Sequence, residues 1–240
     1  MRPAWLRSNN TPLPPQAFAS APTLDEIMYA VNANTDRIQQ LQTESATLNA
    51  EGMPALKADL AFARPNRFRL RAELFQFTGR ELDLGSNDEV FWFWARRDTQ
   101  PAIYYARHSQ YATSGARDLI PVEPSRLLDS LGLIRFDPAD RHDPPVPRDG
   151  DRLEVRSYLP TPRGDMTRVV VVDGKYGWVL EQHLYDSNGQ LLLTAKASKF
   201  RFYQMDGVSL PHQIDVQVTP GQPSQMAFEV DVNSYLINRL

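Results

Sequence analysis

The sequence predicts a mainly β fold (α+β), in which a curved antiparallel sheet of about ten strands forms an unclosed half-barrel. Apolar and polar residues alternate with period two along most segments after residue 40. Asp173-Gly174 and Asn188-Gly189 are typical hairpin turns, and hairpins join antiparallel strands. Residues 90–94 (VFWFW) are apolar at every position, although successive strand side chains point to opposite faces. This strand must therefore be covered on both faces or line a large cavity.

The composition favours one folded domain behind a linker. With 240 residues, 42% of them hydrophobic, the chain has enough apolar material for a core of its own. Residues 1–22 favour an extended chain because they contain Pro3, Pro12, Pro14, Pro15 and Pro22. We therefore expect a proline-rich linker over residues 1–22 and a single half-barrel domain over residues 23–240.

Charge and cysteine content exclude several classes of function. The formal net charge of −3 argues against a nucleic-acid binder that relies on phosphate attraction. Without any cysteine, the chain has no disulfide, thiolate metal site, cysteine nucleophile or lipid-modified N-terminal cysteine within its residues. No stretch approaches the roughly 18 consecutive apolar residues of a membrane helix. We expect a chain without a membrane-spanning helix.

Residues 23–40 are predicted to form the first helix. Thr23 and Glu26 have the spacing of a capping box, in which each side chain binds a free backbone N–H of the other residue. Ile27, Met28 and Val31 then fall on one apolar stripe. Because such a stripe needs a cover, we expect this helix to lie on the sheet as part of a lid.

The next segments read as an antiparallel meander. Residues 55–62 and 67–74 alternate between apolar and polar positions on either side of the Arg64-Pro65-Asn66 turn, which predicts a hairpin with one apolar and one charged face. The glycine-containing turn at residues 85–88 leads into the aromatic strand, and residues 103–105 are predicted to continue the sheet.

The middle of the chain interrupts the sheet. Residues 125–131 are predicted to form a short amphipathic helix with Leu127, Leu128 and Leu131 on its apolar side. Residues 137–149 contain four prolines and predict a loop without regular structure. A helix and loop inserted in this way are typical of a lid over a binding site.

Sheet is predicted again from residue 153 to the end of the chain. The alternating or apolar segments are residues 153–159, 169–172, 178–185, 191–203, 214–218 and 226–232. A curled sheet of this size encloses more space than two helices fill, which predicts an apolar hollow for a hydrocarbon ligand. The candidate lining residues are aromatic or aliphatic, and plain core packing is the alternative for each: Phe62, Phe68, Leu70, Phe91, Trp92, Phe93, Trp94 and Trp178.

Four segments of the chain together resemble the LolA/LolB superfamily of periplasmic lipoprotein carriers, and the resemblance covers most of residues 23–232. They are the helix that starts at Leu24, residues 61–70 (AFARPNRFRL), the Gly85-Ser86-Asn87 turn into residues 91–94, and residues 206–211 (DGVSLP). The resemblance implies an unclosed antiparallel β-barrel under a helical lid. It further implies a non-enzymatic carrier of the bacterial cell envelope, periplasmic or associated with the outer membrane, with no cofactor.

In that family an arginine of the Arg-Pro-Asn segment binds the lid and holds the empty cavity shut, and Arg64 matches its position. This role suits a guanidinium, which offers several donors to the free carbonyls at a helix end. The alternative is an arginine that only solvates the turn. The partners that the resemblance implies are the acyl chains of a lipoprotein or phospholipid and a membrane-associated protein, and we expect the chain to be a monomer.

Other functions stay open at this point. Asp137, Asp140, His142 and Asp143 contain the donors of a divalent-metal site, which makes a metal-dependent hydrolase an alternative, although their spacing matches no known motif. A lipid-responsive envelope sensor of the same fold is a second alternative, and a scaffold with a filled interior is a third. An open apolar hollow favours the carrier, and a packed interior favours the scaffold.

Overall fold

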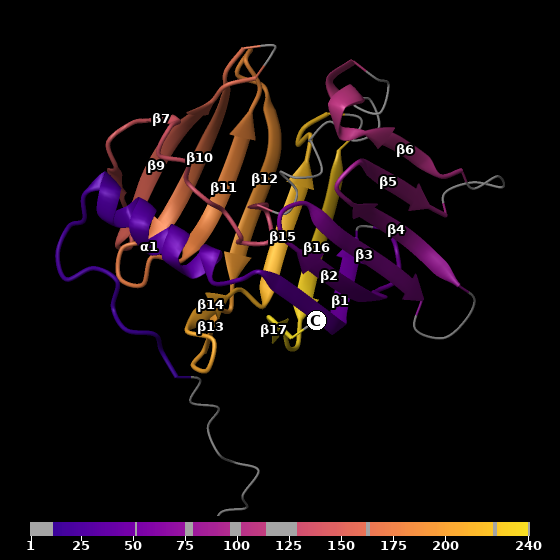
Figure 1. The fold of residues 1–240 in the computed structure, drawn as a ribbon, viewed down its shortest axis with the longest axis horizontal. Helices are drawn as coiled ribbons and strands as arrows, with labels where there is room; N and C mark the ends of the chain where they lie inside the picture. The colour runs from indigo at the N-terminus through magenta and orange to yellow at the C-terminus, as the bar shows by residue number, and fades with distance from the viewer. Residues whose placement is uncertain are drawn as a thin grey trace, which may run out of the picture.

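The computed structural model describes residues 12–50, 52–74, 79–96, 102–113, 129–161, 164–222 and 225–239. In this part of the chain one large sheet dominates, with every neighbouring pair of strands antiparallel (Figure 1). Its strands follow the order β6-β5-β4-β3-β2-β1-β16-β15-β12-β11-β10-β9-β7, while β17 pairs with β1 and β8 with β9. The predicted open antiparallel architecture is confirmed. The predicted number of strands is wrong, because the sheet has 15 strands within the described ranges and several of them are too short to show alternation.

The elements have the following bounds. The helices that lie wholly within the described residues are α1 (Leu24–Asp36) and the 3-10 helix η2 (His108–Thr113). The strands of the first half of the chain are β1 (Gln40–Ala50), β2 (Leu56–Ala63), β3 (Arg67–Leu74), β4 (Arg80–Ser86), β5 (Val90–Ala95) and β6 (Tyr104–Arg107). The later ones are β7 (Arg141–His142), β8 (Val146–Arg148), β9 (Arg152–Leu159), β10 (Met166–Asp173), β11 (Val179–Tyr185), β12 (Leu191–Ser198), β13 (Arg201–Tyr203), β14 (Val208–Leu210), β15 (Gln213–Val218), β16 (Met226–Val232) and β17 (Leu236–Ile237).

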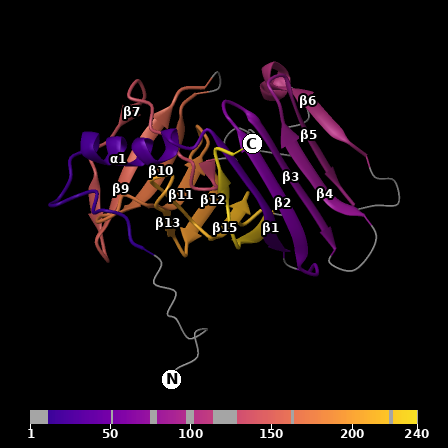
Figure 2. The same cartoon turned by 60° about the horizontal axis from the view of Figure 1, so that its bottom comes forward.

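The helix α1 begins with the predicted capping box. The Thr23 hydroxyl accepts from the Glu26 N–H, and the Glu26 carboxylate accepts from the Thr23 N–H. The helix ends at Asp36, four residues earlier than predicted, because the chain turns into β1 at Gln40. Its buried stripe packs on β9, β10 and β11, and Figure 2 shows it lying away from β2–β5. The helix therefore covers only one half of the sheet.

Two predicted segments differ from the structure. The strand predicted over residues 191–203 ends at Ser198, because Lys199 adopts a left-handed conformation with φ 54° that breaks the extended chain. The chain then forms β13, which pairs with β14 in a separate two-stranded sheet. Residues 137–149 are not wholly irregular either, since β7 and β8 both pair with β9.

Part of the segment predicted as a linker packs against the domain. The Ala17 N–H donates to the Lys175 carbonyl at 2.8 Å, and Phe18 is buried beside Ile27 and Val179. This apolar contact anchors the chain just before α1. The rest of the described segment, from Pro12 to Gln16, lies mostly at the surface.

A buried polar network joins β13, β16 and the end of the chain. His212 is 2% exposed; its Nδ1 lies within hydrogen-bond distance of the Val232 carbonyl, and its Nε2 lies 3.0 Å from the Tyr203 hydroxyl. The Tyr203 hydroxyl also accepts from the Tyr235 N–H. This pattern suits a neutral imidazole that donates from Nδ1 and accepts at Nε2. Burial lowers the pKa of His212, and the bond to the Val232 carbonyl only partly opposes this.

The unfolding free energy is therefore expected to fall as the pH is lowered below about 6.5, the ordinary pKa of histidine. Between that value and the lowered pKa of folded His212, the unfolded chain binds more protons than the folded one, so acid favours unfolding. Urea denaturation at pH 7.5, 6.5 and 5.5 measures how steeply the unfolding free energy changes with pH. His212→Gln, which keeps a donor and an acceptor but does not titrate, is expected to flatten this dependence, and an unchanged slope would contradict this assignment.

Candidate functional site: an open apolar cavity on the inner face of the sheet

The inner face is the face of the sheet on which α1 packs, and strand register defines it across the molecule. Directly paired residues share a face, and one row of pairs runs from Val170 through Gln182, Ala195 and Val216 to Phe228. Val170 lies beneath α1, whereas Phe228 lies beyond the reach of that helix. The inner face therefore continues onto β16 and the strands that follow it in the sheet.

A cavity of about 580 Å³ opens on this continuation. It extends across β1–β5, β15 and β16. Most of its walls are apolar, and the polar side chains among them are Glu81, Arg96 and Gln225. The lining residues are Leu48, Ala50, Met53, Leu56, Leu70, Glu81, Leu82, Leu84, Phe93, Ala95, Arg96, Val218, Gln225, Met226, Ala227 and Phe228.

The cavity continues beneath the last residues of the segment that was predicted as the inserted helix, residues 125–131. A hollow of about 50 Å³ is lined by Ser130 and Leu131 from above and by Phe68 from the sheet. It shares Leu70, Leu84 and Phe228 with the large cavity, so the two hollows adjoin. Residues 125–128, including Leu127 and Leu128, lie outside the described part of the chain. Leu131, the remaining predicted lid residue of this segment, faces the smaller hollow.

Three of the eight predicted lining residues face these hollows. Leu70 and Phe93 line the large cavity, and Phe68 and Leu70 line the smaller hollow. Phe62 is 3% exposed within the core. Phe91 is 2% exposed and packs against Tyr111, with ring centroids 5.6 Å apart. Phe62 and Phe91 are therefore packed in the core, which was the alternative to lining the cavity.

Trp92 and Trp94 lie on the opposite, outer face, so their assignment to the cavity needs correction. Trp92 pairs with Gly85, and a Cβ on Gly85 would lie only 2.2 Å from the indole ring. The Trp92 Nε1–H donates to Asp83 at 3.0 Å, and the Arg69 guanidinium lies over the ring. Trp94 pairs with Asp83 and therefore shares that face. The missing Cβ of Gly85 leaves room for the indole to lie flat on the outer face.

Asp83 is the centre of this outer cluster. Arg69 donates to both of its oxygens at 3.1 and 2.6 Å, and Arg80 donates at 3.2 Å. Burial alone would raise the pKa of Asp83, but the hydrogen bonds from Arg69 and Trp92 and the two guanidinium charges outweigh it and lower the pKa. The ionised Asp83 carboxylate therefore stabilises the fold above its ordinary pKa of about 3.9, and this contribution is lost as the pH falls through the lowered pKa.

Asp83→Asn is expected to lower the unfolding free energy by about 2 kcal/mol, because four charge-assisted hydrogen bonds lose their anionic acceptor. Urea denaturation at pH 7 measures the loss. Asp59→Asn is the matched control on the same face, since Asp59 makes one longer contact with Arg71 at 3.7 Å, and we expect a change of about 0.5 kcal/mol or less. Equal losses in the two variants would contradict the special role of Asp83.

Trp178 belongs to a different hollow. Its ring is stacked between Tyr176 and Phe200, with ring centroids 4.7 and 4.8 Å away. These aromatic residues line a hollow of about 510 Å³ between α1, β13 and the N-terminal segment around Pro14. Since this hollow shares no lining residue with the large cavity, Trp178 does not contribute to the same site.

Arg64 lies in the turn between β2 and β3 and reaches the C-terminal end of α1. Its Nε donates to the Ile38 carbonyl at 2.9 Å, and its Nη2 donates to the Thr35 carbonyl at 3.2 Å. Thr35 lies in the last turn of α1, and its carbonyl also accepts from the Ile38 N–H at 3.1 Å, while Ile38 lies just past the helix end. Burial lowers the pKa of Arg64, and the carboxylates of Asp36 and Asp129 oppose this shift. Arg64 thus joins the β2–β3 turn to the helix.

The predicted lid residues of α1 do not cover the cavity. Ile27, Met28 and Val31 are buried against the valines of β9–β11, such as Val170 and Val172. These three residues therefore pack on the half of the sheet that lies away from the cavity. Among the described residues, the segment that contains Ser130 and Leu131 covers the adjoining hollow.

In the loop considered as a metal site, His142 and Asp143 make hydrogen bonds to β9. His142 Nδ1 contacts the Ser157 hydroxyl at 2.8 Å, and its Nε2 contacts the Asp137 carbonyl at 2.8 Å. Asp143 accepts from the Tyr158 hydroxyl at 2.9 Å. Within the described ranges, no group of three or more His, Cys, Asp or Glu side chains is placed to hold a metal ion.

Sequence reasoning missed most of the aliphatic lining. Leu56, Met226 and Phe228 lie on strands that were predicted correctly, at positions of apolar alternation, and Leu82 and Leu84 line the cavity from β4. The alternation marked the first three as facing inward. It carried no information on whether another side chain or open space lay opposite.

No protein-family model matches the sequence, and no curated protein matches it. Among solved structures, the chain is similar to a LolA superfamily protein from Nitrosomonas europaea, with a TM-score of 0.55 and 12% identity over 92% of this chain and 96% of that one. A domain described as an outer membrane lipoprotein-sorting protein from Vibrio parahaemolyticus has a TM-score of 0.54 and 11% identity, covering 88% and 92% of the two chains. A DUF1329 family protein from Desulfovibrio piger has a TM-score of 0.54 and 12% identity over the same shares.

The protein therefore has a LolA-like fold. At this level of identity the likeness concerns the fold alone, and the chemistry has to be argued from the cavity. In the described part of the chain, no helix has both the length and the apolar character needed to cross a bilayer.

Proposed function

We propose that the protein is a non-enzymatic carrier that holds an acyl chain of a lipid or lipoprotein in the cavity across β1–β5, β15 and β16. The observation that supports this proposal is an open, apolar hollow of about 580 Å³ on the inner face of the sheet. A methylene group is about as large as a water molecule, whose share of liquid volume is roughly 30 Å³. The cavity therefore has the size of about one acyl chain of ordinary length.

The energetics suit reversible binding. Each methylene that leaves water contributes about 0.8 kcal/mol, so a chain buried over most of its length gains several kcal/mol even after the cost of ordering it. A membrane offers the same chain a similar gain. An apolar cavity that is open to its surroundings can therefore exchange a chain with a membrane without covalent chemistry.

The cavity weighs against the scaffold, whose interior would be filled. The LolA-like fold supports a carrier of the bacterial cell envelope, and we place the protein in the periplasm or at the outer membrane, with a membrane-associated protein as partner. The metal-dependent hydrolase has less support, because His142 and Asp143 of its candidate loop are hydrogen-bonded to side chains of β9.

Protein purified from a bacterial lysate that contains membranes is expected to carry lipid. Native mass spectrometry should show mass increments of an acylated molecule, and the delipidated protein should take up a fluorescent fatty acid that palmitate displaces. A protein that copurifies with no lipid and takes up no probe would contradict the proposal.

A further inference from the structure

Gln182 is a buried amide on an apolar face, and no residue in the described part of the chain is its hydrogen-bond partner. It lies on β11 with 2% of its surface exposed. Among the described residues, no group makes a hydrogen bond with its Oε1 or its Nε2. Its neighbours in the strand register are Val170 and Ala195, which offer no side-chain polar atom. A buried amide in this condition loses its hydration without a replacement, which is costly unless a ligand supplies the bonds.

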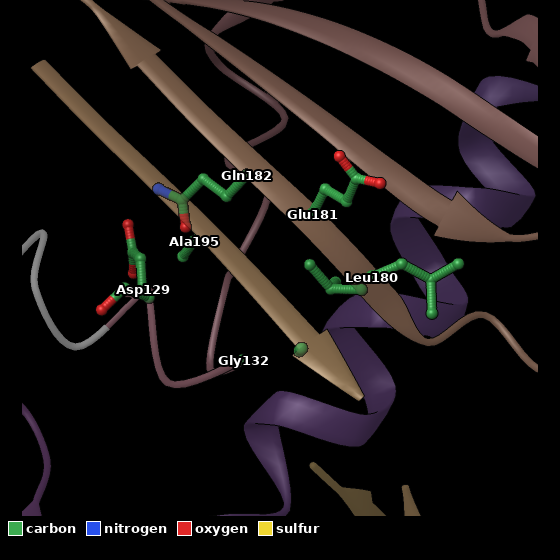
Figure 3. Close-up of a pocket in the computed structure, with 9 residues that line it drawn as sticks. Asp129, Gly132, Leu180, Glu181, Gln182 and Ala195 are labelled. Carbon is green, nitrogen blue, oxygen red and sulfur yellow. The ribbon is translucent and has the colours of Figure 1, made fainter. Parts of the chain in front are cut away.

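The amide faces a small hollow beneath the inserted segment. The hollow has a volume of about 10 Å³, and Asp129, Ser130 and Gly132 line it from above. Figure 3 shows the amide end of Gln182 directed toward Asp129, whereas the Glu181 side chain points away. A space of this size holds about one water molecule. A larger polar group therefore requires the segment from Asp129 to Gly132 to shift outward.

This hollow adjoins the smaller hollow, which lies next to the acyl cavity. Ser130 lines both the Gln182 hollow and the hollow of about 50 Å³, which in turn shares Leu84 and Phe228 with the large cavity. Three strand steps, from β16 through β15 and β12 to β11, separate Phe228 from Gln182. At about 4.8 Å per step this is roughly 14 Å, which is shorter than an extended acyl chain of ordinary length.

We propose that Gln182 binds the polar linkage of the cargo, and that this linkage is an amide, while the acyl chain lies in the large cavity. This inference rests on the proposed function. A side-chain amide offers one acceptor and a donor group, so an amide linkage satisfies both its Oε1 and its Nε2. An ester uses only the donor, and an ether offers a weaker acceptor. The cargo class is therefore a chain joined to an amino group, bound in the order amide, ester, ether.

The test compares two probes with the same charge and similar length, N-hexadecanoylglycine and hexadecyloxyacetic acid. The wild-type protein is expected to bind the amide probe roughly tenfold more tightly than the ether. Gln182→Met keeps the length of the side chain and removes the amide, so it should lower the affinity for the amide probe about tenfold and leave the ether unchanged. Gln217→Met, on the exposed face of β15, is the control and should change neither affinity.

The outcomes separate the two proposals. A wild-type protein that binds neither probe contradicts the proposed function itself. A wild-type protein that binds both probes equally, or a Gln182→Met variant that loses both or neither, overturns the role of Gln182 and leaves the carrier function standing. A second measurement needs no variant: in the NMR spectrum of the wild-type protein, the Gln182 side-chain amide should shift on addition of the amide probe and stay in place with the ether, and the reverse would overturn the inference.

Discussion

Replacing Leu84 by tryptophan is expected to weaken acyl-chain binding by roughly 15-fold. Leu84 lines both the large cavity and the adjoining hollow, so a larger side chain there takes space from the cargo in both. If the indole displaces about two methylenes at about 0.8 kcal/mol each, the loss is about 1.6 kcal/mol. Titration of the delipidated variant with a fluorescent fatty acid measures the affinity. The variant should stay folded, because the new ring occupies open space.

Lys57→Trp is the matched control for this prediction. Lys57 is exposed on β2 and does not line the cavity, so the same aromatic ring adds bulk and apolar surface away from it. Its affinity for the fatty acid should equal that of the wild-type protein. An unchanged affinity in Leu84→Trp, or an equal loss in both variants, would show that the acyl chain binds elsewhere.

The second large effect concerns Arg64. Arg64→Met keeps the apolar stem and removes both guanidinium hydrogen bonds, so the partly buried Ile38 carbonyl loses its Arg64 donor and the Thr35 carbonyl keeps only backbone donors. We expect the unfolding free energy to fall by about 2 kcal/mol and the Tm by roughly 4–8 °C. Calorimetry measures the Tm, and hydrogen exchange should become faster at the C-terminal end of α1.

Arg64→Lys is a useful companion, because an ammonium carries the same charge but lacks the planar fork that reaches two carbonyls at once. It should fall between the wild type and Arg64→Met. A wild-type Tm in Arg64→Met would contradict the capping role. The rate of fatty-acid uptake tests the role in a lid: a faster rate in Arg64→Met supports a contact that holds the empty cavity shut, and an unchanged rate limits Arg64 to the support of α1.

The alternation along the chain was enough to predict most strands and the open sheet. The hairpin of β2 and β3 formed as predicted because both strands alternate in phase, with Leu60 opposite Leu70 on the inner face and Asp59 opposite Arg71 on the outer face. The capping box of Thr23 and Glu26 likewise depends only on local spacing. The hairpin and the capping box each depend on residues that are close in sequence, so the order of residue types is enough to predict them.

The location of the cavity depends on pairings between distant parts of the chain. It lies where β1 meets β16, and that register pairs Ala46 with Val232. No local pattern indicates this pairing. Nor does one show that α1 packs on β9–β11 and leaves the cavity side of the sheet uncovered. The aromatic strand was misleading for a related reason. Trp92 was read as an apolar residue, yet its indole N–H donates to Asp83 of the adjacent strand β4 on the outer face.

The most direct test of the central claim is photo-crosslinking with a 16-carbon fatty acid that carries a diazirine near its methyl end, followed by peptide mass spectrometry. The account predicts adducts on β4, β5 and β16, at cavity residues such as Leu84, Phe93 and Phe228. Adducts confined to the separate hollow around Trp178, or no adducts above those of a heat-denatured sample, would contradict it.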